Sequence, residues 1–280
     1  MSKALAIFEL MRLDKPIGIY LLLWPALLAL VISTNGNFTY SHLLIVIIGS
    51  ILVRSAGCVI NDIWDKDLDG GVKRTKTRPI PSKKLSISES WAVFVALGAL
   101  SLVLLSLTNT NTIFISICFG LMIVLYPLTK RFFIGPQIFL GLTFNPTIIV
   151  YAMTNELNNP TMIFLYLAVA AKTIAFDSFY GLCDIEDDKK LGINSTPLWW
   201  GSKTLLIIAI LQFAVISFLM VVGFKAELSS AWYIGIILLS GFYFYQHRLA
   251  SQKDFLLAFK NNHWASLYLL FLSVFCFLII

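Results

Sequence analysis

The chain has 280 residues, of which 58% are hydrophobic and only 13% are charged, a balance that fits neither one large soluble domain nor two small ones. The formal net charge of +6 comes from basic residues in particular loops between hydrophobic segments, so we expect no nucleic acid partner. The composition instead indicates a protein embedded in a lipid bilayer.

Hydrophobic segments recur along the chain at about the 20-residue length that a helix needs to cross a bilayer. The nine predicted spans are residues 17–33, 43–63, 89–107, 112–129, 134–153, 161–182, 204–224, 231–247 and 263–280. Continuous runs of Leu, Ile, Phe and Val predict helices, because a membrane β-barrel would need short alternating strands. We therefore expect an all-α fold, a polytopic transmembrane bundle of about nine helices that forms a single domain over residues 1–280.

The basic residues predict the orientation of this bundle. They lie before the first span and after the second, fourth, sixth and eighth spans, whereas the opposite side has only Lys225. This asymmetry follows the positive-inside rule and predicts a cytoplasmic N-terminus. The opening segment has neither a small-residue cleavage site nor the Arg-rich and Ser-rich composition of a transit peptide, so we expect a bacterial inner membrane protein.

Two acidic clusters end predicted spans. The first follows the second span and consists of Asn61, Asp62, Asp65 and Asp69. The second ends the sixth span and consists of Asp177, Asp184, Glu186, Asp187 and Asp188. Helical periodicity places the three aspartates of the first cluster on one face, and it does the same for Asp177, Asp184 and Asp188. Because an even number of crossings separates the two spans, both clusters are expected on the cytoplasmic side.

Carboxylates that converge at a membrane surface repel one another unless a cation neutralises them. Oxygen ligands favour Mg²⁺, which usually binds one or two carboxylates together with substrate phosphates. The sequence therefore predicts a magnesium site that holds a diphosphate between the two clusters. The alternative is that these acids are solvated loop residues paired with neighbouring lysines, and two matching clusters on one side favour the metal site.

Basic side chains near the clusters are candidates for phosphate binding. Arg74 and Arg78 belong to a basic run after the first cluster, and guanidinium groups bind phosphate oxygens in bidentate fashion. Tyr126 and Lys130 are four residues apart, on one face at the end of the fourth span, where a hydroxyl and an ammonium can meet the same phosphate.

Two charged residues fall inside predicted spans, where charge is costly and usually faces a cavity. Arg54 shares a helical stripe with Asn61 and Asp65, so it is a candidate for binding an acceptor carboxylate below the metal. Lys172 is either a second site residue or a cation paired with an acidic neighbour.

The motifs that contain these residues resemble the UbiA superfamily of intramembrane prenyltransferases, and within it the 4-hydroxybenzoate polyprenyltransferase branch. The matching stretches are residues 12–18 and 23–25, residues 57–62 with Asp65 and Asp69, residues 73–75 with 78–79, residues 125–127 with 130–131, residues 136–137 and 140–141, and residues 184–188 with 193 and 195–196. Ser178, Asn194 and Lys83 depart from the usual pattern, at positions peripheral to the expected metal ligands.

The resemblance implies a nine-helix bundle with a lateral opening to lipid. It also implies Mg²⁺-dependent transfer of a prenyl chain from polyprenyl diphosphate to 4-hydroxybenzoate, ortho to the hydroxyl, as an early step of ubiquinone synthesis, with no obligate protein partner. The expected metal ligands are Asp62, Asp65, Asp69, Asp184, Asp187 and Asp188. The expected substrate-binding residues are Arg54, Asn61, Arg74, Arg78, Tyr126 and Lys130. The expected catalytic residues are Asp65, Asp177, Asp188, Tyr126 and Lys130, with Asp177 assisting deprotonation of the phenol.

Three alternatives remain at this point. A related prenyltransferase could use a menaquinone or haem precursor as its acceptor. A membrane phosphatidyltransferase also uses clustered aspartates, but its compact motif is absent despite Asp69 and Gly70. A secondary transporter would place its polar site near the midplane rather than at one face.

Overall fold

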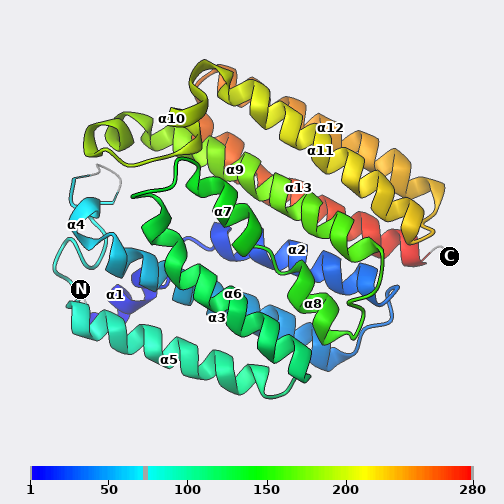
Figure 1. Ribbon diagram of the computed structural model, residues 1–280, viewed down its shortest axis with the longest axis horizontal. Helices are drawn as coiled ribbons and strands as arrows, with labels where there is room; N and C mark the ends of the chain where they lie inside the picture. Colours follow the sequence, from blue (N-terminus) through cyan, green and yellow to red (C-terminus); the bar gives the residue numbers. More distant parts are fainter. Residues whose placement is uncertain (1, 72–74, 279–280) are drawn as a thin grey trace.

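The structure is a computed structural model that describes residues 2–71 and 75–278. Every regular element in these residues is helical, so the predicted all-α class is confirmed. The long helices run side by side, and the short helices α1 (Lys3–Leu10), α4 (Lys66–Asp69) and α10 (Thr196–Trp200) gather at one end of the bundle (Figure 1). We call this end the charged end, because both acidic clusters lie there.

The long helices coincide with most of the predicted spans. Six segments of the described chain are long and apolar enough to cross a membrane, namely α3 (Tyr40–Trp64), α5 (Ile87–Leu105), α6 (Thr110–Thr129), α9 (Thr161–Leu191), Thr196–Lys225 with α11 (Thr204–Lys225), and α13 (Phe255–Leu278). The apolar α2 (Ile17–Ser33) is shorter, the short 3₁₀ helix η1 (Gly201–Lys203) precedes α11, and α12 (Ser230–Ser251) lies between α11 and α13. Helices suit this setting because they satisfy their own backbone hydrogen bonds where lipid cannot.

Side-chain caps start several of these helices. The Thr39 side chain accepts a hydrogen bond from the His42 amide at the start of α3, and Asn109 does the same for Thr112 at the start of α6. At the start of α5, Ser86 and Glu89 form a reciprocal capping box. These caps satisfy amide groups that have no partner inside the helix.

The predicted fifth span is wrong in one respect, because residues 134–153 form two helices rather than one. Helix α7 (Pro136–Thr143) ends before Asn145, and α8 (Thr147–Met153) begins after Pro146, which cannot donate a backbone hydrogen bond. The Asn145 side chain donates to the carbonyl of Tyr166 at 2.8 Å and accepts from the Thr147 amide at 3.2 Å. The Asn145 side chain therefore provides the hydrogen bonds that the polar backbone groups near the break need.

Helix α9 extends further than predicted and carries the whole second acidic cluster. It ends at Leu191, and the following Gly192 adopts the left-handed conformation at φ 66° that favours glycine. In the first cluster, Asp62 lies on α3, Asp65 lies at the junction with α4, and Asp69 ends α4. Both clusters are therefore held by helices rather than by loops.

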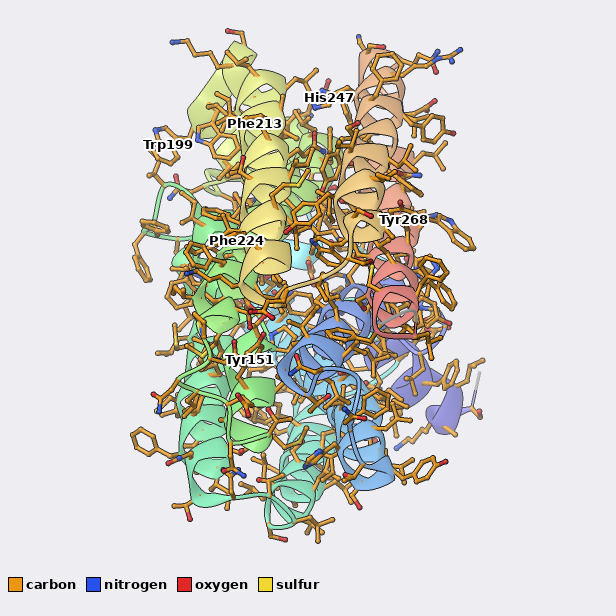
Figure 2. The ribbon with its side chains drawn as sticks, turned by 90° about the vertical axis from the view of Figure 1, so that its right-hand side faces the viewer. Tyr151, Trp199, Phe213, Phe224, His247 and Tyr268 are labelled. Carbon is orange, nitrogen blue, oxygen red and sulfur yellow. The ribbon has the colours of Figure 1, made fainter. Side chains whose placement is uncertain are left out.

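The apolar core lies among α2, α9, α11, α12 and α13 and surrounds fully buried side chains such as Trp232 and Tyr151. The Tyr151 hydroxyl is hydrogen-bonded to that of Thr161 at 2.6 Å. By contrast, Phe213 and Phe224 on α11 project from the outer surface of the bundle (Figure 2), where they are 70% and 71% exposed. Apolar side chains on the outside are expected for a protein that lipid surrounds.

Candidate active site

A cavity of about 990 Å³ extends from the charged end into the bundle. It is lined by residues of α2, α3, α6, α7, α9 and α13 and by the segment after α4. The sequence-predicted site residues on its wall are Arg54, Asn61, Asp62, Asp65, Asp69, Arg78, Tyr126, Lys130, Asp177, Asp184 and Asp188. Asp187 lies on α9 but is not among the lining residues, and Arg74 lies outside the described residues.

Asp62 is bound by two arginines that come from opposite sides of it in the sequence. The side chain of Asp62 is only 1% exposed, and one terminal nitrogen of Arg12 lies 2.7 Å from each of its carboxylate oxygens. Arg78 donates to Asp62 at 3.0 Å and to Asp69 at 2.8 Å. Arg12 belongs to the family motif at residues 12–18, and that motif is the signal that could have identified it as a site residue.

Asp69 ends α4, outside the spanning helices, and the pKa of its carboxyl is shifted. Burial raises the pKa of this carboxyl, the charge of Arg78 opposes that effect, and the nearby carboxylates of Asp62 and Asp65 raise it further. The net direction is upward. Carboxylates crowded in this way gain from a bound cation, which removes their mutual repulsion.

Asp65 is paired with Lys130, which caps the end of α6. The Lys130 ammonium lies 2.9 Å from Oδ2 of Asp65, and the Asn61 amide donates to the same oxygen at 3.2 Å. Burial lowers the pKa of Lys130, but the charge of Asp65 and its hydrogen bond outweigh this, so the net pKa is raised and the ammonium stays charged. The other oxygen of Asp65, Oδ1, is buried without a hydrogen-bond partner in the described part of the chain.

The second acidic cluster reaches the same cavity from α9. Asp177, Asp184 and Asp188 line the cavity together with the aspartates of the first cluster, so carboxylates from two distant stretches of the chain share one space. Within residues 2–71 and 75–278, however, no three His, Cys, Asp or Glu side chains are close enough together to hold a metal ion. A cation at this site would therefore need further ligands from substrate oxygens, which matches the coordination habit of Mg²⁺.

Arg54 lies deeper in the cavity than the first cluster. Its guanidinium carbon lies 5.4 Å above the ring centroid of Phe144, at the break between α7 and α8. Its Nε is buried, and the described residues provide neither an ion pair nor a hydrogen bond to it. A guanidinium with a buried, unsatisfied donor in an apolar setting is a candidate site for an anionic ligand.

Lys172 differs from the expectation that it pairs with an acidic neighbour. It is 5% exposed on α9, and its ammonium contacts the hydroxyl of Ser266 on α13. No described acidic side chain forms an ion pair with it, and it is absent from the wall of the large cavity.

Other cavity residues were not identified from the sequence. His263 on α13 lines the cavity, and its Nδ1 accepts a hydrogen bond from the Trp24 indole at 2.8 Å. Gln137 also lines it and accepts from the Thr196 amide at 2.8 Å, which ties α7 to α10. A single histidine without a pattern provides no signal in one sequence, whereas Gln137 belongs to the motif at residues 136–137, which could have identified it as a site residue.

The fold and the site define an enzyme of the membrane interior. Its helical bundle surrounds a cavity in which acidic and basic side chains meet at one end while apolar helices form the walls. The UbiA prenyltransferase family model matches residues 22–275. The chain therefore belongs to the UbiA prenyltransferase family.

Similar proteins support this assignment over nearly the full length. A 4-hydroxybenzoate octaprenyltransferase of Pseudomonas aeruginosa is 40% identical over 265 residues, covering 92% of this chain and 89% of the relative. One of Vibrio campbellii is 39% identical over 272 residues, covering 95% of both chains. Among solved structures, a UbiA homolog from Aeropyrum pernix K1 has a TM-score of 0.80 at 21% identity, covering 90% of this chain and 94% of that one. A UbiA homolog from Archaeoglobus fulgidus, bound to GPP and Mg²⁺, has a TM-score of 0.75 at 18% identity, covering 98% of this chain and all of that one.

Proposed function

We propose that this protein transfers a polyprenyl chain from polyprenyl diphosphate to the ring of 4-hydroxybenzoate, at the carbon ortho to the hydroxyl, as an early step of ubiquinone synthesis. The observation that carries the proposal is that one cavity holds Asp65 with Lys130, the α9 carboxylates and Arg54, whose Nε is buried without a described partner. The charged end of the cavity suits a metal-bound diphosphate, and the deeper part at Arg54 suits an acceptor carboxylate. The names of the similar bacterial enzymes support this choice of acceptor.

The donor set fits Mg²⁺. The Oδ1 of Asp65 is buried without a partner, and further carboxylates line the same space. In our proposal Asp62, Asp65, Asp69, Asp184, Asp187 and Asp188 would hold the ion together with oxygens of the substrate. When bound, the ion neutralises the charge that develops on the departing diphosphate.

The cations and the hydroxyl of the site act on the same leaving group. Arg78 and Lys130 lie within hydrogen-bond distance of the first-cluster carboxylates, so phosphate oxygens bound there meet fixed positive charge. Arg74 is proposed to add to this charge, and Asn61 and Tyr126 to orient the oxygens. These groups stabilise the charge as the allylic C–O bond breaks and its electron pair leaves with the diphosphate.

The acceptor then attacks the allylic carbon. Its carboxylate binds Arg54, which directs the phenol towards the diphosphate. Asp177 takes the phenol proton, which makes the ortho carbon nucleophilic. After C–C bond formation the ring proton passes to the released diphosphate, which restores the aromatic ring, and Asp177 returns its proton to the phenolate oxygen. Walls such as Phe144 and Phe176 exclude water that would otherwise quench the cation.

The whole chain acts as one domain in this proposal, and the charged end faces the cytoplasm of a bacterium whose inner membrane holds the protein. The support is the basic character of the loops on that side, which follows the positive-inside rule. Polyprenyl diphosphate enters from the bilayer with its tail along apolar helix surfaces.

The test uses the purified protein in detergent. Formation of prenylated 4-hydroxybenzoate from a polyprenyl diphosphate is expected only with Mg²⁺, and Asp65→Ala is expected to abolish turnover while the protein keeps its size-exclusion profile and helical circular dichroism. Menaquinone and haem precursors assayed side by side should not be converted. Full activity of the Asp65→Ala protein, or faster conversion of another acceptor, would overturn the proposal.

A further inference from the structure

Gly18 in the first turn of α2 lies directly against the guanidinium of Arg54. A β-carbon built on Gly18 would lie 2.6 Å from Nη2 and 2.9 Å from Cζ of Arg54, and nearer still to its Nε. Contacts this short do not occur for real side chains, so the guanidinium occupies the space that any residue other than glycine would need. The position of Arg54 therefore depends on the missing side chain of Gly18.

Phe144 contacts the same guanidinium. Its ring centroid lies 5.4 Å from Cζ of Arg54, within the range of a cation–π interaction. Phe144 occupies this place because the chain leaves the helical path between α7 and α8. Gly18 and Phe144 together form a clamp around Arg54, and the clamp joins three segments that are distant in the sequence.

The clamp places two positive features side by side. Helix α2 is 17 residues long and begins at Ile17 without a side-chain cap. The amides of Ile19 and Tyr20 donate to the Pro16 carbonyl, and the amide of Gly18 and the positive end of the helix dipole lie beside the Arg54 cation. Like charges in an apolar surrounding repel unless an anion lies between them. The Nε of Arg54 is buried without a hydrogen-bond partner among the described residues, so this side of the guanidinium is open to an added anion.

We propose that Gly18 is a positioning residue for the acceptor, and that the acceptor carboxylate is shared between the Arg54 guanidinium and the first turn of α2. This inference rests on the proposed function, because it assigns the place of the acceptor within that reaction. Gly18 lets the guanidinium approach the amide groups of the helix, and Phe144 holds it there. The arrangement selects aromatic acceptors with a carboxylate over neutral phenols of the same size.

The substitution Gly18→Ala tests the clamp. The three atoms nearest to the new methyl group all belong to the flexible end of Arg54, so we expect the fold to be kept while the guanidinium moves. The KM for 4-hydroxybenzoate is expected to rise about tenfold, the loss that accompanies one misaligned charge-assisted hydrogen bond. The KM for the prenyl diphosphate should stay within about twofold, because the diphosphate binds at the first cluster.

A double-mutant cycle separates positioning from a merely structural effect. In an Arg54→Ala background, Gly18→Ala should add less than about a twofold change to the acceptor KM, since the group it displaces is gone. Phe144→Leu should raise the acceptor KM, whereas Phe144→Tyr, which keeps the aromatic ring, should have the acceptor KM of the unmodified protein. Gly49→Ala is the matched control, because Gly49 is on the same helix as Arg54. A β-carbon on Gly49 would lie at an ordinary contact distance of 3.5 Å from Leu104.

The outcomes distinguish this inference from the proposed function. If Arg54→Ala raises the acceptor KM but Gly18→Ala does not, or if the two effects multiply, the clamp is refuted and the reaction stands. If neither Arg54→Ala nor Gly18→Ala changes the acceptor KM, the carboxylate does not bind here at all. Both substitutions should leave unchanged the weak binding of 4-hydroxybenzamide, in which the carboxylate is replaced by a neutral amide.

Discussion

Lys130 and Asp65 are separated by 65 positions in the sequence, yet the ammonium of Lys130 lies 2.9 Å from Oδ2 of Asp65. The contact joins the end of α6 to the junction between α3 and α4, at the mouth of the cavity. It leaves Oδ1 of Asp65 buried without a described partner and therefore available for a further ligand. The pair thus combines a fixed positive charge with a free carboxylate oxygen.

Removal of the ammonium should affect chemistry more than folding. Lys130→Ala is expected to lower kcat by about 10²- to 10³-fold, as the loss of one electrostatic donor at a reacting group does. Lys130→Arg keeps the charge and should retain more activity. Single-turnover rates measured with saturating substrates provide the comparison, and equal rates for the Ala variant and the unmodified protein would remove Lys130 from the reaction.

Arg12 should be required although it precedes the first span. It holds the buried carboxylate of Asp62, so Arg12→Ala leaves that charge with Arg78 as its remaining described partner. We expect a rise of about tenfold or more in the KM for the prenyl diphosphate, in line with the cost of breaking a buried charge pair. Lys3→Ala breaks only an exposed pair with Glu89 and should change neither this KM nor the thermal stability.

The break between α7 and α8 should depend on the side chain of Asn145. Asn145→Ala removes a hydrogen bond to the Tyr166 carbonyl and another from the Thr147 amide, both in the apolar interior. The expected loss is about 1–3 kcal/mol of stability per buried group left without a partner, seen as a lower Tm in detergent. Asn37→Ala is the control, because Asn37 is exposed after α2 and its only side-chain hydrogen bond within the described residues goes to the carbonyl of Asn35. An equal Tm for both variants would contradict the proposed role of Asn145.

Lys172 should prove dispensable for catalysis. Its ammonium is buried, contacts Ser266 and lies outside the large cavity. Replacing a buried charge without a counter-ion by an apolar side chain of similar length is expected to be neutral or stabilising. Lys172→Met should therefore keep the kcat and the Tm or raise the Tm, whereas a large loss of kcat with an unchanged Tm would show that Lys172 acts in the reaction.

Removal of divalent cations should stop turnover reversibly. Treatment with EDTA is expected to abolish product formation, and added Mg²⁺ should restore it in full, because the crowded carboxylates of Asp62, Asp65 and Asp69 need a cation when a diphosphate binds. The measurement is the initial rate against free Mg²⁺. Turnover that persists in EDTA after dialysis would argue against a metal-bound diphosphate.

Local patterns predicted much of this molecule. Apolar runs of spanning length gave the positions of α2, α3, α6 and α11 to within a few residues, because hydrophobicity over about 20 residues depends only on the run itself. The fifth span failed because the prediction weighed the hydrophobicity of residues 134–153 above the helix-breaking effect of Pro146. The predicted end of this helix at residue 182 was too early for a related reason. Polar residues at a membrane surface end the hydrophobic run without ending the helix, and α9 continues to Leu191.

The sequence by itself determined that the protein lies in a lipid bilayer, that it is helical, and which charged residues lie inside the bundle. Hydropathy and helical periodicity act between near neighbours, so one chain suffices to read them. Only the tertiary structure decided that Arg12 reaches Asp62, that Lys130 reaches Asp65, and that Gly18 and Phe144 enclose Arg54. Such contacts depend on how the helices pack in three dimensions, and the spacing of residues along one helix contains no information about the neighbour it will meet.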